Sequence, residues 1–345
     1  MLKSAVLGAT GNVGQIFVRL LNNHPWFQIS AVAASERSVG QLYPEASRWR
    51  QPVPVPECVS DMEVLPIDPR RIGDVDVIFS ALPSEVAGEA EETFAQAGYV
   101  VVTNASAHRM DPDVPLLNPE INCDHVTLIE EQRRRRHWDG AIVANPNCST
   151  TILTLPLAPI YEKFGIQRVM VSTMQAISGA GYPGVPSMDI IDNVIPFIKN
   201  EEQKFQTETL KIFGTPKEAA DFKVSASCYR VPTVDGHMES IFVESNQDVD
   251  PESVVEAMEN FVGEPQKLNL PTAPPQPVVV RYEQDRPQTR LDRMEGKGMS
   301  VVVGRVRKDP AFGGIKFVAL GHNTVRGAAG CGILNAEYLK AADYI

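Results

Sequence analysis

A glycine-rich stretch close to the N-terminus is the strongest constraint on the fold. The sequence AVLGATGNVGQIF places Gly8, Gly11 and Gly14 at intervals of three residues. A short apolar segment, residues 2–7, precedes the glycines, and residues 12–23 follow with apolar side chains at helical spacing. Glycines at this spacing allow a tight turn, let a pyrophosphate approach the backbone, and bring the helix against the strand. The stretch predicts a dinucleotide site, with a purely structural turn as the alternative.

The first half of the chain alternates strand-like and helix-like segments. Further strand-like segments are found at residues 27–35, 75–82, 98–106 and 140–146. Helical segments separate several of them, notably residues 84–98. Such alternation predicts a parallel sheet with helices on both faces. We expect residues 1–147 to form an α/β, Rossmann-type dinucleotide-binding domain.

The pattern changes after residue 147. Strand-like segments then follow one another with longer connections, at residues 169–177, 222–232, 237–245 and 300–309. This spacing predicts an α+β domain with a mostly antiparallel sheet, which we assign to residues 148–323. The proline-rich residues 271–279 are compatible only with a loop or an edge strand.

Composition and charge argue against several classes of function. A formal net charge of -11 disfavours a general nucleic-acid binder. No apolar run approaches the roughly 20 residues that a membrane span requires. Five scattered cysteines without a CxxC pair indicate reduced thiols and a cytoplasmic protein, and no metal-ligand spacing is found among cysteines or histidines. The basic run at residues 133–136 is interpreted as a solvated loop, with phosphate binding or assembly as the alternative.

The residues after the second expected strand bear on the choice of nucleotide. Ser35, Arg37 and Ser38 offer hydroxyl groups and a guanidinium at the position where a dinucleotide presents its adenosine ribose. These groups suit the 2′-phosphate of NADP, because a planar guanidinium pairs well with phosphate oxygens. Glu36 could instead bind the free ribose of NAD. We predict NADP.

Cys148 stands at the start of a second helix-like run, in the sequence IVANPNCSTTILTLPL. Asn147 or Ser149 could cap this helix, and a helix N-terminus lowers the pKa of a thiol. A packed, inert cysteine is the alternative. The segment RVPTVDGH adds Arg230, whose guanidinium can hold a carboxylate by two parallel bonds, and His237, which can exchange protons. A surface ion pair and a backbone-bonded histidine are the alternatives for these two. Together the three residues predict a nucleophilic cysteine.

Seven motifs follow one another over nearly the whole chain: GATGNVG, SAHRMDPDVPLLNPEIN, NPNCSTT, QAISGAGYPG, TETLKI, RVPTVDGH and GAAGCGILNAE. Together they resemble aspartate-β-semialdehyde dehydrogenase, in the branch found in archaea and fungi. The resemblance implies NADP-dependent, reversible reduction of 4-aspartyl phosphate to aspartate semialdehyde through a cysteine thioester, in the biosynthesis of lysine, methionine, threonine and isoleucine. It also implies a homodimer or homotetramer built through the second domain.

The resemblance further implies roles for individual residues. Cys148 would be the nucleophile, His237 the acid/base, and Gln175 the residue that orients the substrate or intermediate. The expected substrate-binding residues are Arg230 for the α-carboxylate, Glu208 for the ammonium group, Lys211 and Arg109 for phosphate, and Asn147 beside the cysteine. An exposed ion pair is the alternative for Glu208 and Lys211, and a domain-bridging salt link is the alternative for Arg109. The sequence NEEQK at residues 200–204 offers another glutamate and lysine one or two helical turns earlier.

The glycine loop and the resemblance together define the expected cofactor site. The residues assigned to NADP are Gly8, Thr10, Gly11, Asn12, Val13, Gly14, Ser35, Arg37, Ser38, Ser80, Leu82, Ser178, Gly179, Asn323 and Gly327. The last two lie at the start of a final helical segment, residues 324–345, which would pack back and complete the first domain. No metal is expected.

Three other functions remain compatible with parts of this pattern. Malonyl-CoA reductase resembles this branch, and N-acetyl-glutamyl-phosphate reductase resembles it more distantly. A non-catalytic NADP(H)-sensing protein would use the same glycine loop without a reactive thiol. The combination of Cys148, Arg230 and His237 favours an enzyme, and Lys211 and Arg109 favour an acyl phosphate over a CoA thioester.

Overall fold

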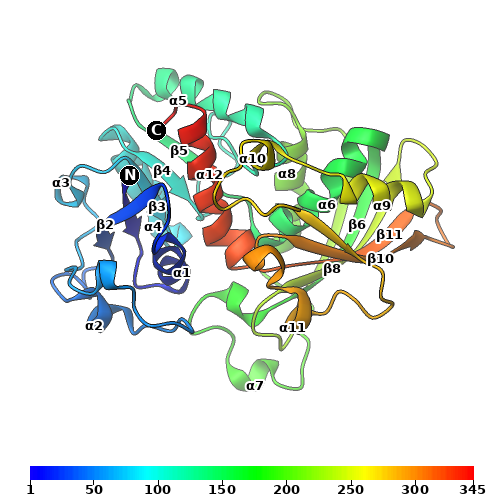
Figure 1. Ribbon diagram of the computed structural model, residues 1–345, viewed down its shortest axis with the longest axis horizontal. Coiled ribbons are helices and arrows are strands. Elements are labelled where there is room, and N and C mark those ends of the chain that lie inside the picture. Colours follow the sequence, from blue (N-terminus) through cyan, green and yellow to red (C-terminus); the bar gives the residue numbers. More distant parts are fainter.

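Five parallel strands form the first sheet of the computed structural model, which describes residues 1–345 (Figure 1). The strands are β1 (Leu2–Leu7), β2 (Phe27–Ala33), β3 (Val77–Ser80), β4 (Val100–Thr103) and β5 (Ala141–Ala144). Their order is β2-β1-β3-β4-β5, so the direction of winding reverses between β1 and β3. In sheets of this type, ligands bind at the carboxyl ends of the strands beside such a reversal.

Helices cover both faces of this sheet, as the alternating sequence predicts. The long helices are α1 (Asn12–Leu21), α4 (Ser84–Gln96) and α5 (Leu128–Arg136). Short helices occur in the connections, namely α2 (Tyr43–Ser47), η1 (Glu57–Val59), α3 (Pro69–Ile72) and η2 (Cys123–Thr127). The C-terminal helix α12 (Gly330–Ala341) returns to this domain, where Ile333 and Leu339 join the core formed by Phe17 of α1 and Phe79 of β3 (Figure 1).

Six strands form the second sheet, in the order β7-β6-β8-β11-β10-β9. They are β6 (Ile166–Gln175), β7 (Lys223–Arg230), β8 (His237–Ser245), β9 (Val278–Arg281), β10 (Val301–Lys308) and β11 (Ile315–Gly321). The pairs β6–β8, β8–β11 and β10–β11 are antiparallel, and β6–β7 and β9–β10 are parallel. The predicted fold class, a Rossmann-type domain followed by an α+β domain with a mostly antiparallel sheet, is therefore confirmed.

The long helices of the second domain pack on one face of its sheet. The covering helices are α6 (Cys148–Phe164), α8 (Glu201–Phe213) and α9 (Pro251–Glu259). Shorter elements complete the domain, namely η3 (Ile177–Ala180), α7 (Ser187–Ile190), α10 (Glu264–Lys267), α11 (Thr289–Asp292), η4 (Glu295–Gly298) and η5 (Val325–Ala329), which leads into α12. On the other face, Met170, Ser172 and Ser240 are exposed. None of the helices of the chain combines the length and the apolar character needed to cross a membrane.

Two local expectations differ from the structure. The basic run at residues 133–136 is the last turn of α5 and not a solvated loop, because Leu128, Ile129 and Gln132 of the same helix are buried and cations are favourable at a helix C-terminus. Pro156 and Pro159 lie inside α6, where proline is expected to kink or end a helix, but the helix continues to Phe164. Every residue from Ser149 to Ile160 is buried, so packing outweighs the lost backbone bonds.

Candidate active site

Cys148 opens α6 at the wall of a pocket that both domains line. Asn147 caps the helix, since its Oδ1 accepts hydrogen bonds from the backbone N–H groups of Ser149 (3.0 Å) and Thr150 (3.2 Å). Gly327 of η5 lies directly against the cysteine, where a Cβ would be 2.6 Å from the Cβ of Cys148. The pocket has a volume of about 250 Å³ and is lined by Val13, Ser84, Asn104, Ser106, Arg109, Asn147, Cys148, Ser178, Gly179, Gly181, Lys204, Asn323, Thr324, Gly327 and Ala328.

His237, the first residue of β8, contacts the cysteine. Its Nε2 lies 3.3 Å from the Sγ of Cys148, and its Nδ1 accepts a hydrogen bond of 3.0 Å from the backbone N–H of Ala176. That backbone donor assigns the tautomer, because a neutral imidazole whose Nδ1 accepts must carry its proton on Nε2. Burial lowers the pKa of His237 to about 3, and the Arg230 guanidinium adds to the effect. At neutral pH the ring is therefore an uncharged donor aimed at the sulfur.

The thiol of Cys148 is protonated in the unliganded protein. Burial raises its pKa to about 12, and the Glu201 carboxylate adds to the increase. Arg109, Arg230 and Lys204 act in the opposite direction but do not outweigh burial. The sequence predicted a lowered pKa from the position at a helix N-terminus, and the structure gives the opposite direction because burial of the partly accessible cysteine desolvates the thiolate.

Arg230 and His237 approach the pocket from β7 and β8, the strands on either side of β6, and Gly179 joins them. Arg230 ends β7, and its Nη1 donates to the carbonyl oxygen of Ala176 at 2.7 Å. A Cβ on Gly179 would lie 2.9 Å from Nη1 of Arg230 and 3.0 Å from Cε1 of His237, so glycine permits this close packing. The structure therefore brings Cys148, Arg230 and His237 together, although they are far apart in the sequence.

Gln175 lies behind the cysteine, where it connects the start of α6 to Glu201. Its Nε2 donates to the hydroxyl of Ser149 and to Oε1 of Glu201, the latter at 2.9 Å. Asn147 Nδ2 donates to the same carboxylate oxygen at 2.9 Å, and Lys204 Nζ lies 3.1 Å from the other oxygen. Burial opposes ionisation of Glu201, but Lys204 and the amide donors hold the pKa below its usual value. Glu201 is thus a buried carboxylate beside the pocket, and Lys204 is one of the residues that line the pocket.

Glu208 and Lys211 occupy different positions from those that the resemblance implies. Both carboxylate oxygens of Glu208 are used, one by Arg109 Nη1 (3.0 Å) and the other by the backbone N–H of Asn147 (2.6 Å). Lys211 Nζ donates to three backbone carbonyl groups and does not line the pocket. Burial lowers its pKa to about 8, so it remains largely protonated at pH 7.

The pair Glu201 and Lys204 lies seven positions earlier, and of its two members Lys204 lines the pocket while Glu201 is buried beside it. This distance is two turns of α8. The sequence indicated the shift only through the second Glu and Lys in NEEQK. The structure thus places Lys204 and not Lys211 in the lining of the pocket, and Arg109 both lines the pocket and forms a salt bridge with Glu208, while the roles of these residues toward the substrate stay predictions.

The glycine loop fits a dinucleotide pyrophosphate. Gly8 has a φ of +72°, and a Cβ there would lie 2.6 Å from the carbonyl oxygen of Ala81, while a Cβ on Gly14 would collide with the carbonyl oxygen of Gly8. No side chain caps α1 at Gly11, so the first-turn N–H groups, including that of Asn12, are free for an anion. Val13 of this turn also lines the Cys148 pocket, which connects the two sites.

The remaining expected cofactor residues form two groups, one after β2 and in the glycine loop, and the other at the Cys148 pocket. Accessible side chains include Ser35, Arg37 and Ser38 after β2 and Thr10 in the loop. Ser178, Gly179, Asn323 and Gly327 line the Cys148 pocket, where Asn323 Nδ2 donates to the hydroxyl of Ser178 at 2.9 Å.

The side chains of Ser80 and Leu82 point away from this site. The Ser80 hydroxyl donates to the buried carboxyl group of Glu91 at 2.6 Å, and Leu82 belongs to the hydrophobic core. Only the backbone of this segment approaches the glycine loop, through Ala81 and the N–H of Leu82. Ser80 and Leu82 would therefore contact a cofactor through their backbone, and their assignment to the cofactor site stays a prediction. No group of three or more His, Cys, Asp or Glu side chains is arranged to hold a metal ion.

Two family models match the chain. The semialdehyde dehydrogenase NAD-binding domain matches residues 3–129, and the semialdehyde dehydrogenase dimerisation domain matches residues 157–326. An aspartate-semialdehyde dehydrogenase of Methanothermobacter thermautotrophicus is 56% identical over 345 residues, covering 99% of both chains. A malonyl-CoA reductase (NADP) of Metallosphaera sedula is 46% identical over 353 residues, covering 100% of this chain and 99% of the relative. The crystal structure of the aspartate-semialdehyde dehydrogenase of Candida albicans with NADP superposes with a TM-score of 0.92 at 42% identity, covering 100% of both chains.

Proposed function

The chain belongs to the semialdehyde dehydrogenase family, and from this premise we propose that it is an NADP-dependent, phosphorylating dehydrogenase of aspartate semialdehyde. It interconverts 4-aspartyl phosphate and aspartate semialdehyde, in the biosynthesis of amino acids derived from aspartate. The observation that carries the proposal is the 3.3 Å contact between the sulfur of Cys148 and Nε2 of His237, in a pocket that Arg109 and Lys204 line. The pocket continues to the glycine loop through Val13.

Each charge of the substrate has a partner of opposite charge at the pocket. Arg230 would bind the α-carboxylate through its planar guanidinium. The Glu201 carboxylate would attract the ammonium group, and Arg109 and Lys204 would bind phosphate. An acidic protein must concentrate cations locally to bind anions, and these side chains supply that local positive charge.

In the oxidative direction, Cys148 is the nucleophile. Its proton passes to solvent, and this is the single proton that the overall oxidation releases. The thiolate then adds to the aldehyde, and His237 donates its Nε2–H to the oxyanion of the thiohemiacetal while keeping its proton. Bound NADP supplies the hydride acceptor. The resulting thioester on Cys148 is cleaved by the phosphate that Arg109 and Lys204 hold, which restores the thiol as the leaving group.

The residues that would hold NADP are those of the glycine loop and the two groups described above. The N–H groups at the start of α1 would bind the pyrophosphate, and Arg37 with its neighbouring serines would bind the 2′-phosphate. Ser178, Gly179, Asn323 and Gly327 would surround the nicotinamide. We accordingly assign nucleotide binding to residues 1–147 with 324–345, and catalysis to residues 148–323.

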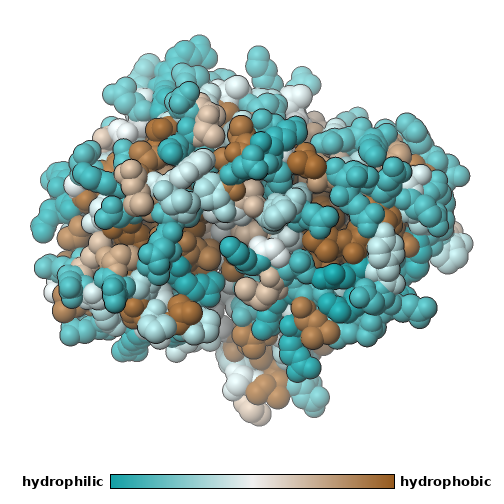
Figure 2. Space-filling model, viewed as in Figure 1, coloured by the Kyte–Doolittle hydropathy of each residue, from teal (hydrophilic) through white to brown (hydrophobic).

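A homodimer or homotetramer is the expected assembly. The match to a dimerisation domain supports assembly through the second domain. Met170 and Ser240 are exposed on the face of its sheet opposite the long helices. The projecting segment around α7 also exposes apolar side chains, with Met188 88% and Phe197 67% exposed (Figure 2). A second copy of the chain would cover these surfaces, which light scattering of the purified protein would test. The cytoplasm is the expected location, in agreement with five free cysteines, and cell fractionation would test it.

Malonyl-CoA reduction is the second candidate, because a relative with that name is 46% identical. The substrate of that reaction brings a CoA thioester in place of an acyl phosphate. Arg109 and Lys204 together favour phosphate, since two cations at one end of the pocket suit a dianion.

An NADP⁺-linked assay separates these candidates. Aspartate semialdehyde is supplied with or without phosphate, malonate semialdehyde is supplied with or without CoA, and reduction of NADP⁺ is followed. We expect turnover that requires phosphate, and none with Cys148→Ala, which should still bind NADPH. Turnover that requires CoA would favour the second candidate, and turnover by the Cys148→Ala variant would remove Cys148 from its role.

A further inference from the structure

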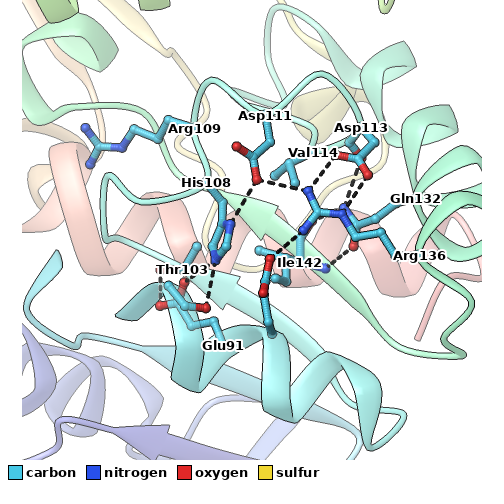
Figure 3. A network of polar contacts seen from close by, with 12 residues as sticks. Glu91, Thr103, His108, Arg109, Asp111, Asp113, Val114, Gln132, Arg136 and Ile142 are labelled. Carbon is cyan, nitrogen blue, oxygen red and sulfur yellow. Dashed lines mark hydrogen bonds and ion pairs between the residues drawn. The ribbon is translucent and has the colours of Figure 1, made fainter. Parts of the chain in front are cut away.

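The loop that carries Arg109 is held by cations that lie outside the pocket. This loop, residues 104–118, runs from the end of β4 to the region where Leu116 forms a bridge with Ala144. Arg109 points away from a polar cluster at the other end of the same loop (Figure 3). The position of its guanidinium therefore depends on how the loop is fixed.

Lys211 of α8 binds the backbone of this loop as an internal cation. Its Nζ donates to the carbonyl oxygens of Arg109 (2.7 Å), Asp111 (2.7 Å) and Val114 (2.9 Å). These three bonds use all three ammonium protons. One turn earlier on the same helix, Glu208 pairs with the guanidinium of Arg109 at 3.0 Å. Helix α8 thus fixes both the backbone and the side chain of Arg109.

Arg136, at the end of α5, binds the side chains of the same loop (Figure 3). Its Nε and Nη2 donate to the two carboxylate oxygens of Asp113, both at 2.6 Å. Nη2 also donates to Asp111 at 2.9 Å, and Nη1 donates to Glu92 of α4 at 2.9 Å. A bidentate ion pair of this kind fixes the relative orientation of the guanidinium and the carboxylate as well as their distance. Arg134, from the same basic run, is exposed and has no such partner.

We propose that Lys211 and Arg136 are positioning residues that hold residues 109–114 so that Arg109 faces the phosphate end of the pocket. The inference rests on the proposed function, because it takes Arg109 as a phosphate ligand. Without the two cations the loop would occupy several conformations, and the affinity for phosphate would fall in proportion to the fraction of competent loop. Neither Lys211 nor Arg136 touches the substrate.

The test compares Lys211→Met with Lys217→Met, and Arg136→Gln with Arg134→Gln. Each control makes the same chemical change at an exposed position. NADP⁺ reduction is measured with phosphate varied at saturating aspartate semialdehyde, and then with the roles reversed. We expect the KM for phosphate to rise about tenfold in both Lys211→Met and Arg136→Gln. This rise corresponds to a loop of which about one tenth is in the conformation that binds phosphate. The KM for aspartate semialdehyde and the Kd for NADPH should change less than about twofold, while amide exchange should accelerate within residues 106–116.

Two results would overturn the inference. One is an unchanged KM for phosphate in both Lys211→Met and Arg136→Gln. The other is an equal rise in the KM of both substrates, because that is the mark of a general loss of structure. Should Lys211→Met fail to fold, Arg136→Gln decides by the same measurements. A wild-type protein without phosphate-dependent turnover would instead refute the proposed function. In that case amide exchange tests whether Lys211 and Arg136 hold the loop. Acceleration confined to the loop in the variants supports this role, and unchanged exchange contradicts it.

Discussion

Replacing Gly327 by alanine tests the geometry around the nucleophile most directly. The added Cβ would lie 2.6 Å from the Cβ of Cys148 and 2.9 Å from its Cα. Non-bonded carbon atoms pack at about 3.5–4.0 Å, so the two residues must separate by about 1 Å. Both atoms of Cys148 belong to the rigid start of α6, and no rotation of a side chain relieves the contact. Gly327→Ala must therefore move the sulfur relative to His237.

The magnitude follows from that displacement. A shift of about 1 Å at a reacting group costs about 100-fold in rate, which corresponds to about 2.7 kcal/mol in the activation free energy. Overpacking should also lower the free energy of unfolding by about 1–3 kcal/mol. We expect kcat to fall about 100-fold, and the Kd for NADPH to change much less than kcat, because Gly327 is one of several residues assigned to the nicotinamide and the glycine loop that would bind the pyrophosphate is untouched.

The assay follows NADP⁺ reduction at saturating substrates, with NADPH binding measured by fluorescence titration. Gly88→Ala in α4 is the matched control, because its Cβ would meet only the Cβ of Ala107, at an ordinary 3.7 Å. This control should retain wild-type kcat. A Gly327→Ala protein with kcat close to that of the wild type would refute the reasoning that the contact with η5 sets the position of Cys148.

Three further predictions follow from single contacts. Arg230→Lys should raise the KM for aspartate semialdehyde at least about tenfold, because one ammonium replaces two parallel bonds; an unchanged KM would contradict carboxylate binding by Arg230. Alkylation of Cys148 by iodoacetamide should accelerate steadily from about pH 7 to pH 10, since its raised pKa keeps the thiolate fraction growing with pH, and a plateau near pH 8.5 would disagree. Arg326→Met should lower the free energy of unfolding, measured in urea, by about 3–5 kcal/mol, because Arg326 pairs with the buried Glu120 at 2.6 and 2.8 Å. Adding Glu120→Gln should recover a large part of that loss, and no recovery would contradict the pairing.

The local pattern of the sequence predicted most of the first domain. Gly8 and Gly14 indicated the turn because Gly8 has a positive φ and a Cβ on Gly14 would collide with Gly8, and both of these requirements are local. The strands of the first sheet were also predicted, because strands buried on both faces are short apolar runs. Strand β11 was not predicted, although Ile315, Phe317 and Ala319 alternate with less buried residues in the period of a strand. The cysteine and its helix cap were readable as well, since Asn147 precedes Cys148 directly.

The charged residues of α8 show why a sequence motif did not suffice to identify the residues that line the pocket. Glu201 with Lys204 and Glu208 with Lys211 have the same spacing on one helix, so the sequence alone could not decide which pair faces the pocket. The decision depends on what each side chain meets. Lys204 lines the pocket, whereas Lys211 meets three carbonyl groups of a loop about one hundred residues earlier.

The sequence by itself determined the order of most elements and the phosphate turn, because each depends on neighbours within a few residues, and it indicated Cys148 as the candidate nucleophile only together with the distant Arg230 and His237. Only the tertiary structure decided the protonation of Cys148 and His237 and the roles of the cations. The pKa of a side chain depends on its burial and on charges brought from distant segments of the chain. Whether a lysine is available to bind substrate or instead fixes a loop depends on which acceptors the fold places around it.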